Sequence, residues 1–526
     1  MRDFHLPGRS TVHALNGMCA TSHPLAARVA IQMLENGGNA VDAAVAGAAL
    51  LGICEPHMTG LGGDSFVLLK PAGEDRIVAL NGSGRAPAGL DAETLRAAGH
   101  AEIPVHSPHA VTIPGAVDCF CRLVQDWGRQ GLHASLAPAI HYAEQGIPVA
   151  PRVAADWARS AGFLRQDARN FYLLQGQPPT PGSVFRAPAQ AEVLRRIAAE
   201  GRAGFYEGEV AEDMVQSLRA AGGTHTAEDF AATACEYTEP IIGSYKGIEL
   251  IEHPPNGQGA TAILLANILK NFDLPALNPF GARRAHIEAE AAKLAYDARD
   301  RFIADMQHVQ NLRHMLSEQT AATLAALVDP DRAMADPRGL SQHVHRETVY
   351  ITVVDQDRMA VSLIYSIYHA FGSGIASSRF GILFQNRGAG FTLERGHPNE
   401  AAGGKRPMHT IIPAMLRQKG RFCMPFGVMG GAYQPCGHVR LISNLIDYGL
   451  DLQTAIDGPR SFPEKGLLQL ERGYAADVRE RLAGMGHRVV VPEMPLGGAQ
   501  AIEINEEAGV LVGASDPRKD GCALGY

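Results

Sequence analysis

The chain has 526 residues, of which 46% are hydrophobic and 19% charged, with a formal net charge of −8 at pH 7. This composition is typical of a globular protein with a large core, and the lack of a long basic cluster argues against a nucleic-acid partner. No run of about 18 apolar residues predicts a membrane span, and the first residues lack the apolar segment of a secretory signal, so we expect a cytoplasmic protein without membrane contacts.

Small residues in the first part of the chain predict helices that pack closely together. Residues 23–56 predict two helices, the second rich in alanine, separated by Gly37 and Gly38. The following TGLGGD resembles a phosphate-binding loop but lacks the lysine and the preceding strand, so it predicts a tight turn into a strand over residues 65–69. A further strand over residues 77–80 leads into a Gly/Pro-rich loop that carries Ser83 and Arg85.

The pattern in the middle of the chain predicts helices and strands with a structural role. Residues 110–240 alternate helical patterns with loops, a strand follows at residues 249–252, and a long amphipathic helix begins near residue 286. Metal binding is not indicated, because His343 and His345 have no third ligand nearby and the eight cysteines contain no C-x-x-C pair. We expect neither a metal nor a cofactor. A dinucleotide-binding oxidoreductase is disfavoured because no G-x-G-x-x-G joins a strand to a helix.

Residues 348–354 and 359–368 predict a strand, a turn and a second strand. Alternation along a strand places Thr348, Tyr350 and Thr352 on one side, and Ile364, Ser366 and Tyr368 on one side of its partner. Hydroxyl groups are therefore expected to gather near the start of a buried strand.

The sequence of this hairpin and of the segment after it resembles a known protein family. TVYITVVD, AVSLIYSIYHAFGSG and GILFQN resemble the start of the small subunit of gamma-glutamyltransferases, a family of N-terminal-nucleophile hydrolases. Further similar motifs follow in the family's order over residues 15–515. The resemblance implies a four-layer αββα sandwich of the α+β class. It also implies a cut between Glu347 and Thr348 that yields a large subunit, residues 1–347, and a small subunit, residues 348–526. The two subunits are expected to form a heterodimer, and a dimer of such heterodimers is the alternative assembly.

The chemistry suits a threonine at such a cut. Before the cut, the Thr348 hydroxyl can attack the carbonyl of Glu347 to form an ester that water opens. Afterwards Thr348 holds both the nucleophile and an α-amino base, whose pKa of about 7.7 to 8.0 suits neutral pH. Acyl transfer also needs donors for the oxyanion. Gly430 and Gly431 match the family's paired glycines with that role, and Ser366 stands where a threonine hydroxyl bonds to the nucleophile.

The substrate-binding positions depart from the family pattern. Ser83 occupies the position of the arginine that holds the substrate α-carboxylate, and Arg85 is a candidate to replace it. Tyr368 replaces an asparagine, and Arg387 and Gly390 replace the polar residues that hold the glutamyl amino group. His409 and Thr410 replace a pair of serines.

An arginine at position 387 favours a carboxylate and repels an ammonium. Motifs such as KRPMHTIIPAM and FGVMGGAYQ also resemble the branch with cephalosporin (glutaryl) acylases. We therefore expect an amidase for small-molecule amides of anionic, dicarboxylate-type acyl groups. True gamma-glutamyl transfer or glutathione hydrolysis is the first alternative, and a non-catalytic relative that binds a carboxylate is the second.

Overall fold

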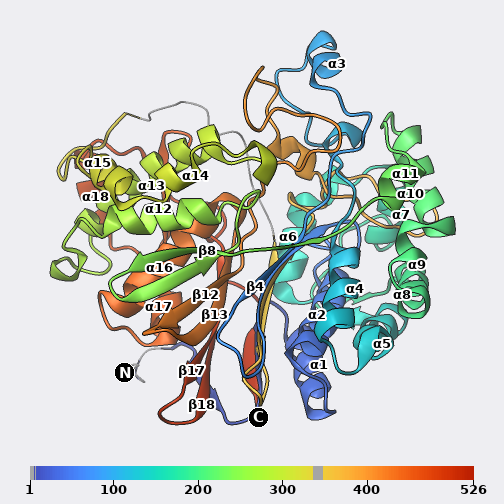
Figure 1. Ribbon diagram of the computed structural model, residues 1–526, viewed down its shortest axis with the longest axis horizontal. Coiled ribbons are helices and arrows are strands. Elements are labelled where there is room, and N and C mark those ends of the chain that lie inside the picture. The colour runs from blue at the N-terminus through green and yellow to red at the C-terminus, as the bar shows by residue number, and fades with distance from the viewer. Residues whose placement is uncertain (1–4, 6, 336–347) are drawn as a thin grey trace.

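The computed structural model describes residues 5, 7–335 and 348–526. Two seven-stranded antiparallel sheets stack at its centre, and helices cover the outer face of each sheet (Figure 1). This arrangement confirms the expected αββα sandwich.

The first sheet is built around the predicted hairpin. Its strands run in the order β19 (Cys522–Gly525), β2 (Met18–Thr21), β10 (Val349–Val354), β11 (Ala360–Ser366), β3 (Asp64–Lys70), β4 (Val78–Gly82) and β7 (Glu236–Thr238). Every residue of β10 and β11 is buried, because one face of this sheet meets helices and the other meets the second sheet. Strands covered on both faces carry continuous apolar runs, as this hairpin does.

The second sheet also combines distant parts of the chain. Its order is β1 (Val12–Ala14), β18 (Val510–Ser515), β17 (Gly498–Asn505), β13 (Arg421–Met429), β12 (Ala414–Gln418), β9 (Ile248–Glu252) and β8 (Ile241–Tyr245). Apolar side chains from both sheets fill the space between them, among them Met18, Leu68, Ile251, Met415, Ile502 and Leu511.

Helices α1 (Pro24–Glu35), α2 (Ala40–Cys54), α4 (Ala116–Trp127) and α5 (Gly131–Gln145) lie on the side of the first sheet (Figure 1). All 15 residues of α2 are buried, and a capping box between Asn39 and Asp42 fixes its start. A Cβ at Gly47 would come within 2.4 Å of Ile351 Cδ1, so this glycine permits the close approach of α2 to β10.

Helices α12 (Gly259–Leu269), α13 (Ala282–Phe302) and α16 (Gln434–Ile446) lie on the side of the second sheet (Figure 1). The remaining helices are α3 (Ala92–Ala97), α6 (Pro151–Ser160), α7 (Gln166–Tyr172), α8 (Pro188–Glu200), α9 (Ala203–Tyr206), α10 (Gly208–Ala220), α11 (Ala227–Ala231), α14 (Leu312–Met315), α15 (Glu318–Ala325), α17 (Leu452–Asp457) and α18 (Ala476–Gly484). Short strands form two small sheets, β14 (Ser461–Glu464), β15 (Leu467–Leu470) and β16 (Val489–Val490) in one, and β5 (Ile147–Pro148) and β6 (Val184–Phe185) in the other.

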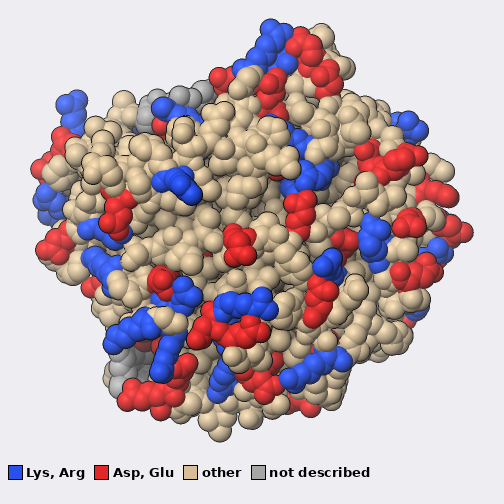
Figure 2. Space-filling view, in the orientation of Figure 1, with Lys and Arg blue, Asp and Glu red and all other residues tan. Residues whose placement is uncertain are grey.

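The surface carries mixed charges. On the face shown in Figure 2, lysine and arginine side chains are interspersed with aspartate and glutamate. Within residues 5, 7–335 and 348–526, every helix is too short or too polar to cross a bilayer.

Candidate active site

Thr348 lies immediately before β10, at the end of the strand that pairs with β11. Its side chain is buried, and its Oγ1 lies 3.4 Å from Oγ of Ser366, the last residue of β11. The same Ser366 oxygen accepts a hydrogen bond of 2.8 Å from the backbone N–H of Tyr368. The structure therefore brings together the two hydroxyl groups for which the family resemblance implied a contact. The residue before Thr348, Glu347, lies outside the described residues, as do His343 and His345.

A cavity of about 590 Å³ opens beside Thr348. Apolar side chains such as Met58, Phe163 and Met494 form part of its lining. Its charged lining consists of Arg152, Arg159, Lys465 and Lys519 together with Glu464 and Glu493. Two of these cations, Arg152 and Arg159, form ion pairs with Asp156 at 2.7 Å and 3.2 Å.

Gly430 lines the same cavity, at the end of β13. Gly430 and Gly431 both have positive φ angles, +122° and +56°, a region that glycine adopts readily. A Cβ at Gly430 would come within 2.8 Å of Gly497 Cα, so the backbone here packs too closely for a side chain. Gln258 Nε2 donates to the Gly431 carbonyl at 2.9 Å and fixes the turn. Gly430 thus lines the same cavity as the candidate nucleophile, and Gly431 follows it in the turn.

Arg387 is fully buried behind this hydroxyl pair. Its Nη1 donates to Thr410 Oγ1 at 3.0 Å, and its Nη2 lies 3.4 Å from Ser366 Oγ. The guanidinium carbon lies 4.0 Å from the centre of the Tyr368 ring, a cation–π contact. Four of the candidate binding and catalytic residues, Ser366, Tyr368, Arg387 and Thr410, therefore form one buried group.

The backbone of Tyr368 differs from the prediction. The second strand was expected to continue through Tyr368, but β11 ends at Ser366 and Tyr368 has a φ of +80°. The chain turns away because Ile367 N donates to Met58 O instead of continuing the ladder. The predicted strand was therefore two residues too long, and after the turn the Tyr368 ring lies against Arg387.

Asp64 and His409 form a buried pair next to this group. Asp64 begins β3 and lies opposite Ser366 in the β3–β11 register. Its carboxylate accepts hydrogen bonds from Gly84 N at 2.8 Å, Gln385 Nε2 at 2.9 Å, His409 Nε2 at 3.1 Å and Gly115 N at 3.3 Å. Burial raises the pKa of Asp64 to about 6, although the positive charge of Arg387 opposes the rise. Burial and the Arg387 charge hold the pKa of His409 well below its ordinary value, so the ring is neutral and donates from Nε2.

Ser83 and Arg85 lie in a neighbouring network. The Ser83 hydroxyl donates to Asn81 Oδ1 at 2.7 Å, and its carbonyl accepts from Arg406 Nε at 3.0 Å. Arg85 forms ion pairs with Glu236 at 2.8 Å and Asp305 at 3.2 Å. These carboxylates direct the Arg85 guanidinium toward a partly exposed ion-pair cluster that also includes Arg406.

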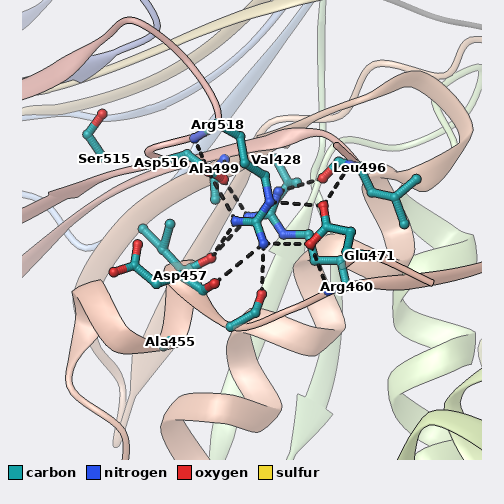
Figure 3. A network of polar contacts seen from close by, with 12 residues as sticks. Val428, Ala455, Asp457, Arg460, Glu471, Leu496, Ala499, Ser515, Asp516 and Arg518 are labelled. Carbon is teal, nitrogen blue, oxygen red and sulfur yellow. Dashed lines mark hydrogen bonds and ion pairs between the residues drawn. The ribbon is translucent and has the colours of Figure 1, made fainter. Parts of the chain in front are cut away.

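A polar network holds the outer wall of the cavity (Figure 3). Glu471 accepts hydrogen bonds from Arg518 Nη2 at 2.6 Å, from Leu496 N at 2.8 Å and from Arg460 N at 3.0 Å. Asp516 accepts from Ala499 N at 2.7 Å and pairs with Arg460, and the charges of Arg460 and Arg518 lower the Asp516 pKa to about 2 against the effect of burial. The network therefore joins three segments that line the cavity, those around Lys465, Met494 and Lys519.

Sequence reasoning missed Asp64 and the basic residues of the cavity. Arg152, Arg159, Lys465 and Lys519 come from α6, the β14–β15 turn and the C-terminal segment. No motif joins them in the sequence, and only the folded chain brings them together. Asp64 did have a signal, a charged residue at the start of an otherwise apolar strand.

One group of described residues has the donor atoms for a metal ion: His286, Glu290 and His487. Its hydrogen bonds are already formed, because His286 Nδ1 lies 2.8 Å from His487 Nε2 and Lys293 Nζ lies 2.8 Å from Glu290 Oε1. The Lys293 ammonium thus supplies the positive charge beside Glu290, and the group ties α13 to Asp329 and Met334.

Comparison with known proteins gives a consistent result over the whole chain. A family model described as gamma-glutamyltranspeptidase matches residues 26–526. An oxamate amidohydrolase proenzyme from Klebsiella pneumoniae is 36% identical over 529 residues, covering 97% of this chain and 98% of the relative. A glutathione hydrolase-like YwrD proenzyme from Bacillus subtilis is 34% identical over 521 residues, with coverages of 97% and 98%. The crystal structure of cephalosporin acylase from Bacillus halodurans matches with a TM-score of 0.92 and 36% identity, covering 100% of this chain and 99% of that one.

Proposed function

Because the chain belongs to the gamma-glutamyltranspeptidase (gamma-glutamyltransferase) family of enzymes, we propose that it cleaves itself between Glu347 and Thr348 and then hydrolyses amides of anionic, dicarboxylate-type acyl groups. The two fragments remain together as a heterodimer in this proposal. Support for Thr348 as the nucleophile comes from its position beside the Ser366 hydroxyl and at the wall of a cavity.

The reaction proceeds in two steps. In the first, the freed α-amine of Thr348 takes the hydroxyl proton, and Oγ1 attacks the amide carbonyl. The oxyanion is stabilised by backbone N–H groups of the Gly430–Gly431 turn, the C–N bond breaks, and the amine departs with the proton. In the second, water attacks the resulting ester with the α-amine as general base, and the free acid leaves.

The assignment of an anionic acyl group depends on one observation, which is that Arg387 is fully buried beside Ser366. Its guanidinium contacts Thr410 and Ser366, and the positive charge that it places behind the nucleophile favours a carboxylate over an ammonium. The name of one relative, oxamate amidohydrolase, is that of an enzyme for a small anionic amide. A gamma-glutamyl group carries an ammonium, which makes it the less favoured substrate.

Arg387→Gln tests the proposal. The wild-type enzyme is expected to turn over glutaryl-p-nitroanilide faster than gamma-glutamyl-p-nitroanilide. The variant should lose about 100-fold in kcat/KM for the glutaryl substrate, because it loses a charged hydrogen-bond donor, while the gamma-glutamyl rate changes far less.

Arg284→Gln is the matched control for loss of a buried arginine. Arg284 is also buried, but it bonds Ser443 and Asn444 on α16. This variant is expected to lose stability without changing the ratio of the two substrates. Faster turnover of the gamma-glutamyl substrate by the wild type would overturn the anionic assignment and support gamma-glutamyl transfer.

A further inference from the structure

The glycine turn that follows β13 is held by hydrogen bonds to its carbonyl groups. The Gly430 carbonyl accepts from Tyr433 N at 3.0 Å, and the Gly431 carbonyl accepts from Gln258 Nε2 at 2.9 Å. The C=O and N–H groups of one trans peptide point in opposite directions. A bond that fixes a carbonyl therefore also fixes the N–H group of the same peptide, so these two bonds set the direction of the Gly431 N–H and of the next one.

Gln258 links this turn to two other parts of the site. It is fully buried and directly precedes α12, and its Nε2 also donates to the Thr410 carbonyl at 2.7 Å. Its Oε1 accepts from Arg299 Nη1 on α13 at 3.0 Å. A guanidinium can only donate and a carbonyl can only accept, so this set of partners permits one orientation of the Gln258 amide. One side chain thus sets the distance between the glycine turn and the loop that carries Thr410.

Helix α13 holds the turn at a second point. Tyr296 donates its hydroxyl hydrogen to the Ala432 carbonyl, and the guanidinium carbon of the buried Arg299 lies 4.5 Å from the centre of the Tyr296 ring. Both residues of α13 precede Thr348 in the chain, as Gln258 does, whereas the turn follows it. The segment before the proposed cut therefore fixes a turn that belongs to the segment after it.

Resting on the function proposed above, in which this turn stabilises the oxyanion, we propose that Gln258 is a positioning residue for the reaction. It holds the N–H groups of the Gly430–Gly431 turn in the direction that the oxyanion requires, and Arg299 and Tyr296 support it. The oxyanion exists only in the transition state and the tetrahedral intermediate, so its donors stabilise these states and not the unreacted amide. A displaced turn therefore lowers kcat and leaves KM nearly unchanged.

Gln258→Glu tests the proposal in the full-length, cut protein at pH 8. Glutamate keeps the length of the side chain and the acceptor for Arg299, but its carboxylate is ionised at this pH. The second oxygen then faces the carbonyls of Thr410 and Gly431 and repels them. We expect kcat to fall about 10- to 100-fold, with KM within about twofold of the wild type. The assay uses glutaryl- or gamma-glutamyl-p-nitroanilide, whichever the wild type turns over faster, and rates are divided by the fraction of cut chain from intact mass.

A boronic acid gives a second measurement, one that follows the oxyanion donors directly. In 4-boronobutanoic acid, B(OH)2 takes the place of the reacting carbonyl of a glutaryl group. Addition of Thr348 Oγ1 to boron, with transfer of the hydroxyl proton to the α-amine, gives a tetrahedral anion that resembles the intermediate. Its inhibition constant should rise in Gln258→Glu by about the factor by which kcat falls. For a wild type that prefers the gamma-glutamyl substrate, the 2-amino derivative of this acid takes its place.

Gln190→Glu is the matched control. Gln190 on α8 is also buried, and its Nε2 donates to the Tyr172 hydroxyl at 2.6 Å and to the Gly381 carbonyl at 3.3 Å. It too joins the segment before Thr348 to the segment after it, but through a different loop. Its variant should lower the midpoint of thermal unfolding and leave kcat and the inhibition constant unchanged. A wild-type kcat in Gln258→Glu overturns the proposal, as does a loss that lies in KM alone or an equal kcat loss in Gln190→Glu.

Other results separate this inference from the function on which it rests. If Gln258→Glu does not fold or is not cut, Tyr296→Phe decides. It removes the hydroxyl that donates to the Ala432 carbonyl and should lower kcat about fivefold at constant KM, and an unchanged kcat overturns the proposal. If the wild type is cut and active but both variants keep its kcat, only the role of Gln258 fails. If the wild type stays uncut or hydrolyses neither substrate, the proposed function fails and this inference falls with it.

Discussion

The chemistry of the site depends on a few side chains around one hydroxyl group. Thr348 Oγ1 has Ser366 on one side and the cavity on the other, while Gly430 forms the adjacent wall. Ser366 links the nucleophile to Arg387, since its Oγ lies within 3.4 Å of both Thr348 Oγ1 and Arg387 Nη2. Changes at any of these residues are therefore expected to lower the reaction rate.

Gly430→Ala tests the role of the glycine turn. The added Cβ would meet Gly497 Cα at 2.8 Å with φ at +122°, so the turn must shift. We expect a loss of about 1–3 kcal/mol in unfolding free energy and a decrease in kcat of about 100-fold as the oxyanion donors move. Thermal unfolding and steady-state kinetics measure the two effects.

Gly449→Ala is the control, because Gly449 also has a positive φ, +60°, but its Cβ would meet open space. It should cost a similar backbone strain and leave kcat unchanged. Equal kcat values for Gly430→Ala and the wild type would exclude the turn from catalysis.

How far the sequence predicts the site can be seen from single residues. Alternation along the hairpin predicted only that hydroxyls gather near the start of a buried strand, and the family resemblance implied the contact between Thr348 and Ser366 that the structure has. The position of Tyr368 was not predictable from alternation, because a backbone contact with Met58 ends the strand early. Asp64 was missed because its four partners come from separate loops that only the closed fold brings together.

At the scale of elements, the outer wall of the cavity is made of three separate segments. The β14–β15 hairpin, the loop before β17 and the segment before β19 each contribute lining residues. None of the three belongs to the helix layers, and the network in Figure 3 joins them through Glu471, Arg460 and Arg518. The shape of the cavity thus depends on a buried charge network at a distance from Thr348.

Glu471→Gln tests this dependence. The variant removes the largely buried negative charge that pairs with Arg518, while Asp516 remains beside both Arg518 and Arg460. We expect a loss of about 3 kcal/mol in unfolding free energy, typical of breaking a buried ion pair, together with a higher KM. Glu506→Gln is the control, because its ion pair with Arg421 is exposed and such pairs contribute about 0–1 kcal/mol. Equal stability losses in the two variants would show that the network does not hold the wall.

At the scale of the molecule, the segments before and after Thr348 are interleaved. Strands β10 and β11 lie between β2 and β3 in the first sheet, and β12, β13, β17 and β18 lie between β9 and β1 in the second. Neither segment could complete a sheet alone, so fragments produced by a cut at Thr348 should stay together in native buffer. The layered fold itself was predictable from the resemblance, whereas the interleaving of these strands follows from pairings between residues hundreds of positions apart.

The most direct test is the intact mass of freshly purified protein under denaturing conditions, with native size measured in parallel. We predict two polypeptides, residues 1–347 and 348–526, that elute as one particle in native buffer, and a single uncut chain for Thr348→Ala. A wild-type protein that remains one intact chain after long incubation, or a Thr348→Ala protein that is cut at the same bond, would contradict the account.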